Sequence, residues 1–483
     1  MPDHMVAQDI ERIKSEMDAS QRVHHAFSKL GIAAMLNQSN IRNNSRRLEG
    51  EKDSSRRSAY TIFIFLFLLV FQGFNLYRFL QSKKGDCACS KNTYYRFLGN
   101  SHYNWSRFLT LLSSKVIALI EPLTNARRVK CFVLDDSVTE RGRSKKVELL
   151  TRVYDHSIGK CVKGFNLLLL GWTDGFSFIP TGFTMLSSAN KENRLVDADE
   201  KIDKRSNGWK RRKEAVLPKM DAAIMMLKQA LNAGIQASYV LMDSWFTCEP
   251  FIHRIKEIGL EVIGMLKDTK QQYWYHGRLM NLRQLAGLVR FETAGDIFGS
   301  VSVKTKFHQI PVKLVFVRNR NKRNEYIILL STDLSLSNAE IVRIYGNRWS
   351  IECCFKVCKS LLKLGHEFHG ISFDMTVSSA AIVFTRFIIL EWLRREDCDP
   401  RTAGELFFMV YDEVRDMELS QALKSLLEIF ASGICNGTIK ISESVRVQLA
   451  EWFFSQPRFI QALFPAFLSA SGLFTENAPI PCQ

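Results

Sequence analysis

The sequence lacks cysteine pairs at the spacing of a zinc site. Its eleven cysteines include Cys87-Ala-Cys89 and Cys353-Cys354, but no second cluster is spaced to complete a ligand set. No basic N-terminal segment leads through an apolar run to a cleavage site, and no internal repeat is evident. These absences predict reduced thiols and a cytoplasmic protein, with Cys353, Cys354 and Cys358 as packing residues of a helix.

Acidic residues are fewer than basic ones. The 483 residues include 66 Lys and Arg against 49 Asp and Glu, which gives a net charge of +17. This balance favours a polyanionic partner, nucleic acid before a membrane, although a generally basic solubilising surface has the same charge. Because 46% of the residues are hydrophobic, the chain can bury a sizeable core, and its length predicts two or three domains.

One long uncharged stretch stands out near the N-terminus. From Ser58 to Tyr77 there is no charged residue, which is enough to cross a bilayer as a helix. Gln72, Gly73 and Asn75 interrupt its far end, and no second span is evident. A buried helix in a large core has the same pattern. Both interpretations stay open, and the buried helix is favoured.

Apolar runs in the middle of the chain predict buried strands. The run 129–134 is followed directly by Asp135-Asp136-Ser137, and the run 237–242 ends at Asp243. Further strands are expected at 148–154, 164–172, 176–186 and 260–266, and helices at 214–233 and 249–258. This mixed order of elements predicts an α/β domain with a central sheet.

The remaining segments divide the rest of the chain. Residues 1–57 predict an N-terminal helical region with a polar linker, and 26–41 has the helix–glycine–helix pattern of a helix-turn-helix or of a plain helical hairpin. We expect a helical region at 58–128, the sheet core at 129–267 and 336–370, an inserted β subdomain at 268–335, and a C-terminal helical region at 371–483.

A predicted helix within 338–365 has a polar face. Tyr345, Arg348, Glu352 and Lys359 lie at offsets of three, seven and fourteen residues. At about 100° per residue they fall within roughly 60° of one another. Around Glu352 alone this is also the pattern of an exposed face with ordinary i,i+4 pairing. A carboxylate for a metal and cations for phosphates on one helix are, however, what phosphoryl transfer requires.

Two aspartates extend this face to a candidate metal site. Asp136 and Asp243 close predicted strands, and groups at the carboxyl ends of strands in α/β sheets converge on one crevice. With Glu352 they would supply three carboxylates for two divalent ions, and hard oxygen ligands select Mg²⁺ or Mn²⁺ over zinc. Asp135 competes with Asp136, because strand alternation points only one of them to a given face.

The spacing Tyr345-x2-Arg348-x3-Glu352-x6-Lys359 resembles the signature of the insertion-sequence-four group of DDE transposases. The resemblance implies a ribonuclease-H-like core split by the β insertion. It also implies a DNA transposase that binds the terminal inverted repeats of an insertion sequence, as a homodimer, and catalyses strand cleavage and strand transfer. The rival interpretations are a DNA-binding relative without catalysis and a protein anchored in a membrane by residues 58–77.

The resemblance implies roles for single residues. Related transposases commonly have an acidic residue, then the metal-binding Asp, then Ser or Thr, and this pattern selects Asp136 over Asp135. Asp136, Asp243 and Glu352 would then be the catalytic residues and the ligands of two Mg²⁺ or Mn²⁺ ions. The residues implied in phosphate contact near the transferred end are Tyr345, Arg348 and Lys359.

Basic clusters and one aromatic residue agree with a DNA partner. Residues 201–213 hold seven basic side chains, among them Lys210, Arg211 and Arg212, against one acid. Such loops neutralise phosphates, although a solvated loop has the same composition. Trp274, in the insertion, is the candidate for stacking on a flipped base, although an aromatic there is more often a core residue.

Overall fold

The computed structural model describes residues 25–42, 58–82, 89–123, 128–267, 271–289, 295–319, 325–368, 370–396, 405–408, 411 and 442–455. The chain forms two compact units, His24–Phe408 and a second made of Met1–Val23 with Met409–Gln483. In the second unit the described helix is α15 (Glu443–Ser455). Residues 1–24 and 43–57 of the predicted N-terminal region, and most of the predicted C-terminal helical region after 396, lie outside the described residues.

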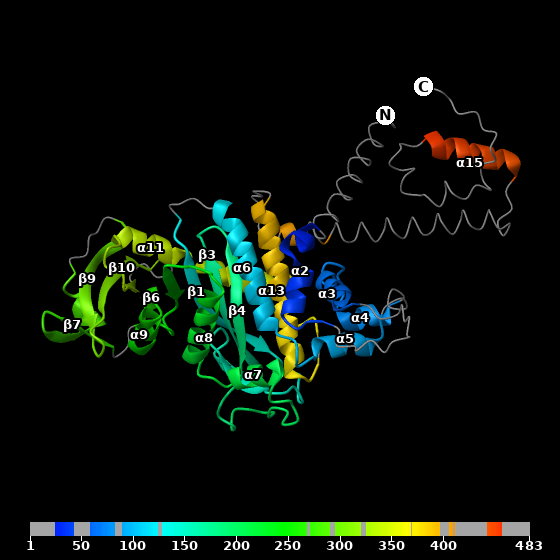
Figure 1. Cartoon of the computed structure of the whole chain (residues 1–483). Helices are drawn as coiled ribbons and strands as arrows, with labels where there is room; N and C mark the ends of the chain where they lie inside the picture. Colours follow the sequence, from blue (N-terminus) through cyan, green and yellow to red (C-terminus); the bar gives the residue numbers. More distant parts are fainter. Residues whose placement is uncertain are drawn as a thin grey trace. The chain divides into compact units, whose positions relative to one another are not determined.

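One mixed sheet organises the unit His24–Phe408 (Figure 1). Its strands are β1 (Cys131–Glu140), β2 (Thr151–Asp155), β3 (Lys160–Thr173), β4 (Phe178–Leu186), β5 (Tyr239–Met242), β6 (Glu261–Leu266), β7 (Gln272–Tyr275), β8 (Arg278–Asn281), β9 (Ile297–Thr305), β10 (Pro311–Arg318) and β11 (Tyr326–Ser331). They lie in the order β2-β3-β1-β5-β6-β11-β10-β9-β7-β8, and β4 pairs with β3 outside this path.

The centre of the sheet has the ribonuclease-H-like arrangement. β3 pairs antiparallel with both β4 and β1, whereas β1, β5 and β6 follow one another in parallel. The predicted α/β fold is therefore confirmed. The strands of the predicted insertion continue this sheet, because β11 pairs antiparallel with β6.

Helices cover the sheet and pack against one another beside it. They are α2 (Ile32–Gln38), α3 (Ala59–Leu68), α4 (Leu76–Gln81), α5 (Lys91–Leu98), α6 (Trp105–Ile120), α7 (Asn207–Glu214), α8 (Lys219–Asn232), α9 (Glu249–Glu257), α10 (Leu282–Ala286), α11 (Asn338–Gly346), α12 (Trp349–Ser360) and α13 (Phe373–Glu396). Figure 1 shows α6 and α13 side by side next to β4, and the three elements contact one another. The apolar positions of α6 recur every three or four residues, so one face of this helix is buried.

The uncharged stretch 58–77 is a short core helix followed by a turn. α3 has 10 residues, about half of the roughly 20 that a bilayer needs. Phe63 is fully buried and packs edge-on against Phe108, with ring centroids 5.4 Å apart. One helix of the described residues, α13, has the length and hydropathy of a membrane span, but the whole of that apolar segment is buried inside the protein. The buried-helix interpretation is therefore the one that the fold supports.

Candidate active site

Aspartates follow the buried apolar runs of two neighbouring parallel strands. The first four residues of β1, Cys131–Leu134, and all of β5 are buried, which is typical of central parallel strands. Leu134 of β1 lies opposite Met242 of β5, so Asp135 and Asp243 come next on the two strands. β1 does not stop there as predicted. It continues through Asp136 to Glu140, because β3 keeps pairing with it.

Asp135 and Asp136 point to opposite faces of β1. Asp135 Oδ2 accepts a hydrogen bond from Arg348 Nη1 at 3.0 Å. Asp136 Oδ1 instead accepts from Lys219 Nζ at 2.8 Å, and its Oδ2 accepts from Asn166 Nδ2 at 2.5 Å. Strand alternation produces this division. Asp135 therefore faces the helix that carries Glu352, whereas Asp136, which the family pattern selected, faces α8.

The helix predicted within 338–365 is two helices. α11 ends at Gly346 and α12 begins at Trp349. Between them the N–H of Arg348 donates to the carbonyl of Tyr345, and the N–H of Ser350 donates to the carbonyl of Asn347. These i to i+3 bonds make a tighter turn than an α-helix. Arg348 and Glu352 still lie on one face despite the break between the helices, because they are one helical turn apart at the start of α12.

Arg348 joins the carboxylates of the site. Its Nη1 contacts Asp135 and its Nη2 is paired with Glu352. Tyr345 lies beside this guanidinium, and burial raises the pKa of its phenol to about 12. Lys359, further along α12, donates from Nζ to Ser137 Oγ at 2.6 Å. The four residues of the predicted polar face therefore all lie near the part of β1 that contains Asp135 and Ser137.

The surroundings of Asp135 raise its pKa. Burial raises the pKa of Asp135 from 3.8 to about 6, and the negative charges of Asp243 and Asp136 act in the same direction, while Arg348 opposes them. Asp243 is itself fixed, because its Oδ1 accepts from the N–H groups of Trp245 at 3.0 Å and Phe246 at 3.3 Å. A buried carboxyl among other carboxylates is a site that a further cation would stabilise.

The arrangement of the donors fits a divalent ion only after one rearrangement. In the described part of the chain, no three His, Cys, Asp or Glu side chains are grouped to hold a metal ion. Arg348 lies between Asp135 and Glu352 and takes part of their charge. The donor atoms are nevertheless carboxylate oxygens, which are the ligands that Mg²⁺ and Mn²⁺ prefer. Their use as ligands requires Arg348 to leave at least one of its two carboxylates.

Two protein families match this chain. The family described as DDE superfamily endonuclease matches residues 51–283, and the family described as transposase DDE domain matches residues 218–384. These matches support a DDE transposase. The first match contains Asp135 and Asp243, and the second contains Asp243 and Glu352. Both families imply a nuclease-type enzyme with DNA as its substrate. No curated protein matches the chain.

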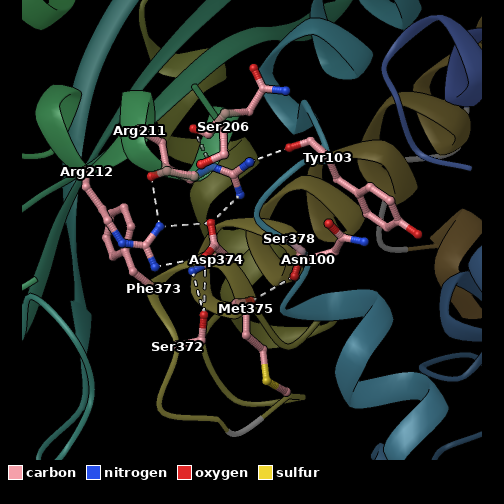
Figure 2. A network of polar contacts seen from close by, with 12 residues as sticks. Asn100, Tyr103, Ser206, Arg211, Arg212, Ser372, Phe373, Asp374, Met375 and Ser378 are labelled. Atoms are coloured by element: carbon pink, nitrogen blue, oxygen red, sulfur yellow. Dashed lines mark hydrogen bonds and ion pairs between the residues drawn. The ribbon is translucent and has the colours of Figure 1, made fainter. Parts of the chain in front are cut away.

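Part of the predicted basic cluster 201–213 is internal. Figure 2 shows Arg211 and Arg212 of α7 turned toward Asp374 at the start of α13. Arg212 Nη2 lies 2.8 Å from Asp374 Oδ2 and 2.6 Å from Glu148 Oε2. The two arginines are only 9% and 6% exposed, so their predicted contact with DNA is incompatible with their position. Lys210, between them and the surface, is exposed.

The candidate site has further residues that were not predicted. Lys219 and Asn166 hold Asp136, and no sequence motif marked them. Trp245 is 46% exposed. Its position two residues after the strand-end Asp243 was the signal in the sequence that could have identified it. Trp274 lies in β7, where its indole Nε1 donates to the carbonyl of Lys306 at 3.0 Å. Its stacking on a flipped base stays a prediction.

Proposed function

We propose that this chain is a DNA transposase of the insertion-sequence-four group, which cleaves the ends of a mobile element and joins them to target DNA. Its substrate is double-stranded DNA with terminal inverted repeats, and two copies of the chain hold the two ends as a homodimer. A net charge of +17 supports a protein that works on nucleic acid. We expect it in the bacterial cytoplasm, associated with the nucleoid.

The proposal is supported by the placement of carboxylates from distant parts of the sequence, with Asp135 and Glu352 both paired to Arg348. Asp135 and Asp243 come from adjacent strands, and Glu352 reaches the same place from α12 through Arg348. We assign the first position to Asp135 and not to Asp136, because Asp136 faces Lys219 on the other side of the strand. Hydrolysis and transesterification of DNA need such a carboxylate set at a strand edge.

The chain supplies ligands, positive charge and a hydrogen-bond donor to this reaction. Asp135, Asp243 and Glu352 would hold two Mg²⁺ or Mn²⁺ ions, which when bound activate the attacking oxygen and stabilise the leaving one. Arg348 lies beside these carboxylates as a guanidinium suited to a phosphate. Tyr345 stays a neutral phenol at physiological pH, because its pKa is about 12, and it can donate a hydrogen bond to a phosphate oxygen.

Contacts with DNA outside the carboxylate set come from exposed side chains. Lys359 lies at the β1 edge and is exposed, as is Lys210 on α7. Both are proposed to bind backbone phosphates, which fix the register of a protein on DNA without reading sequence. Arg211 and Arg212 are not proposed as contacts, because their charges are used by Asp374 and Glu148.

The experiment compares carboxamide variants on one substrate. A supercoiled plasmid carries the DNA that encodes this chain together with its flanking sequence, and nicking is followed with and without Mg²⁺. We expect Asp135→Asn, Asp243→Asn and Glu352→Gln to lose Mg²⁺-dependent nicking while still retarding the plasmid's end fragments in a gel. Asp136→Asn is the matched control for Asp135→Asn, and it should still nick measurably, although more slowly than the wild type. Full nicking by folded Asp135→Asn would refute the assignment.

A further inference from the structure

A cleft of about 600 Å³ opens beside Asp136 and Ser137 of β1. Its wall includes Asp136, Ser137, Asn166, Lys219 and Lys359, together with residues of β2 and its turn. The volume falls within the range of about 300–1,000 Å³ found for small-ligand sites. It is therefore the size of one or two nucleotides and too small for a duplex. The cleft borders the helix of the carboxylate set, since its lining residue Lys359 lies on α12, which also carries Glu352.

Lys219 is held at this wall by two neighbours. Its Nζ lies 2.8 Å from Asp136 Oδ1 and 4.1 Å from the centre of the Trp245 ring. A cation over the face of a tryptophan is a favourable contact, and it explains why Trp245 stays at the surface. The side chain of Lys219 is 19% exposed, so the ammonium is restrained but still reachable from the cleft. Lys219 is also the first residue of α8, where the helix dipole favours an anion.

Asp136 has the contacts of a positioning residue. Both of its oxygens are engaged, one by Lys219 and the other by Asn166 of the neighbouring strand β3. A carboxylate held in this way orients an ammonium, much as ligand-orienting partners do in metal sites. On the other side of the cleft, Lys359 reaches Ser137. The ammonium groups of Lys219 and Lys359 thus contact Asp136 and Ser137, the two residues that follow Asp135.

The charge of the cleft suits a phosphate chain. Lys219, Lys359 and the exposed Arg152 line it together with two acids, Asp136 and Asp155. Asp155 is ionised, because hydrogen bonds from Ser157 lower its pKa. Lys219 shares Asp136 with Asn166, so its ammonium is only partly neutralised and keeps donors for another oxygen.

We propose that this cleft holds the DNA strand next to the scissile phosphate, with Lys219 binding one of its phosphates and with Asp136 and Trp245 positioning Lys219. The inference rests on the proposed function, and it names the path of the strand into that site. Asp136 acts through Lys219, and it is not a metal ligand. The strand in the cleft is unpaired, because the cleft admits nucleotides one or two at a time.

The test measures binding apart from cleavage. The full-length chain is titrated with a fluorescent single-stranded oligonucleotide of mixed sequence, without divalent metal, over a series of salt concentrations. Lys219→Ala should weaken binding about tenfold at low salt, as expected for the loss of a charged hydrogen bond. It should also reduce the slope of log affinity against log salt by about 0.7. Lys219→Arg should restore both quantities.

The matched control is Lys228→Ala. Lys228 lies on the same helix, is exposed, and does not line the cleft, so its loss should change neither the affinity nor the slope. Equal binding by Lys219→Ala and the wild type would overturn the proposal, as would equal losses in Lys219→Ala and Lys228→Ala. Circular dichroism and melting of each variant identify any loss that comes from unfolding, and Lys219→Arg then decides the question.

Cleavage separates the two roles of the neighbouring aspartates. On the plasmid substrate with Mg²⁺, Asp136→Asn should nick more slowly but measurably, while Asp135→Asn should not nick. Abolition of nicking by Asp136→Asn, as complete as that by Asp135→Asn, would identify Asp136 as a metal ligand and overturn the positioning role. If the wild type itself does not nick, the proposed function fails, yet the binding titration still tests the cleft. The two failures are therefore distinguishable.

Discussion

Asp135 should make the metal-free protein less stable at neutral pH. Its pKa rises from 3.8 to about 6, a difference of about 2 units, because the carboxyl is buried among other carboxylates. At 1.36 kcal/mol per unit, the ionised form costs the folded state at most about 3 kcal/mol. Because the folded-state pKa is the higher one, this cost is absent below about pH 4, grows as the pH rises through about 6, and is complete at pH 8.

Asp135→Asn removes this cost without removing the oxygen that Arg348 contacts. We expect the variant to unfold at a higher denaturant concentration than the wild type at pH 8, by an amount equivalent to at most about 3 kcal/mol. The two proteins should unfold alike at pH 4. The measurement is denaturant unfolding of the whole chain in the presence of a chelator. Addition of Mg²⁺ should stabilise the wild type by mass action and leave Asp135→Asn unchanged.

The matched control is again Asp136→Asn, which removes the ion-pair partner of Lys219 and should not stabilise the protein. A gain for Asp135→Asn that is equal at pH 4 and pH 8 would show that the cause is not ionisation. No gain at pH 8 would mean that Asp135 is already neutralised in the folded protein. Either result would refute the reasoning that Asp135 lies in a cluster of carboxylates short of positive charge.

Three other substitutions test the fold and the DNA contacts. Arg212→Met leaves Glu148 buried without its ion-pair partner and Asp374 with Arg211 alone, and it should lower the free energy of unfolding by about 3–5 kcal/mol, measured by denaturant titration. Phe63→Ala should lower it by about 3–5 kcal/mol through the cavity it leaves, whereas a residue facing lipid would have little effect on a soluble preparation. Lys359→Ala should reduce the salt slope for duplex binding by about 0.9, measured by fluorescence anisotropy.

The strands that build the site were readable because their side chains are buried on both faces. The apolar runs before Asp135 and Asp243 are β1 and β5, and their parallel pairing brings the two aspartates together. Alternation in β1 also predicted that only one of Asp135 and Asp136 faces Glu352. Which of the two does so depends on where α8 and α12 pack. That is a property of the tertiary structure, and the family pattern pointed to the other residue.

Arg211 and Arg212 of the basic segment 201–213 were misread for a similar reason. Its composition is that of a solvated loop, and α7 within it was not expected. The partners of Arg212 are Glu148, 64 residues earlier, and Asp374, 162 residues later. An inspection of neighbouring sequence positions does not find acidic partners at such separations. A buried, paired arginine therefore cannot be distinguished in the sequence from an exposed one. The break between α11 and α12 was missed as well, because the polar spacing continues through it.

The burial of α13 has a consequence for synthesis. Nearly all of its 24 residues are buried, and it contacts α3, α5, α6 and β4, which leave the ribosome much earlier. Until residue 396 has emerged, those elements have apolar faces with nothing to cover them. Nascent chains therefore remain prone to aggregation for most of translation. We expect gene copies interrupted before codon 373 to yield no stable fragment.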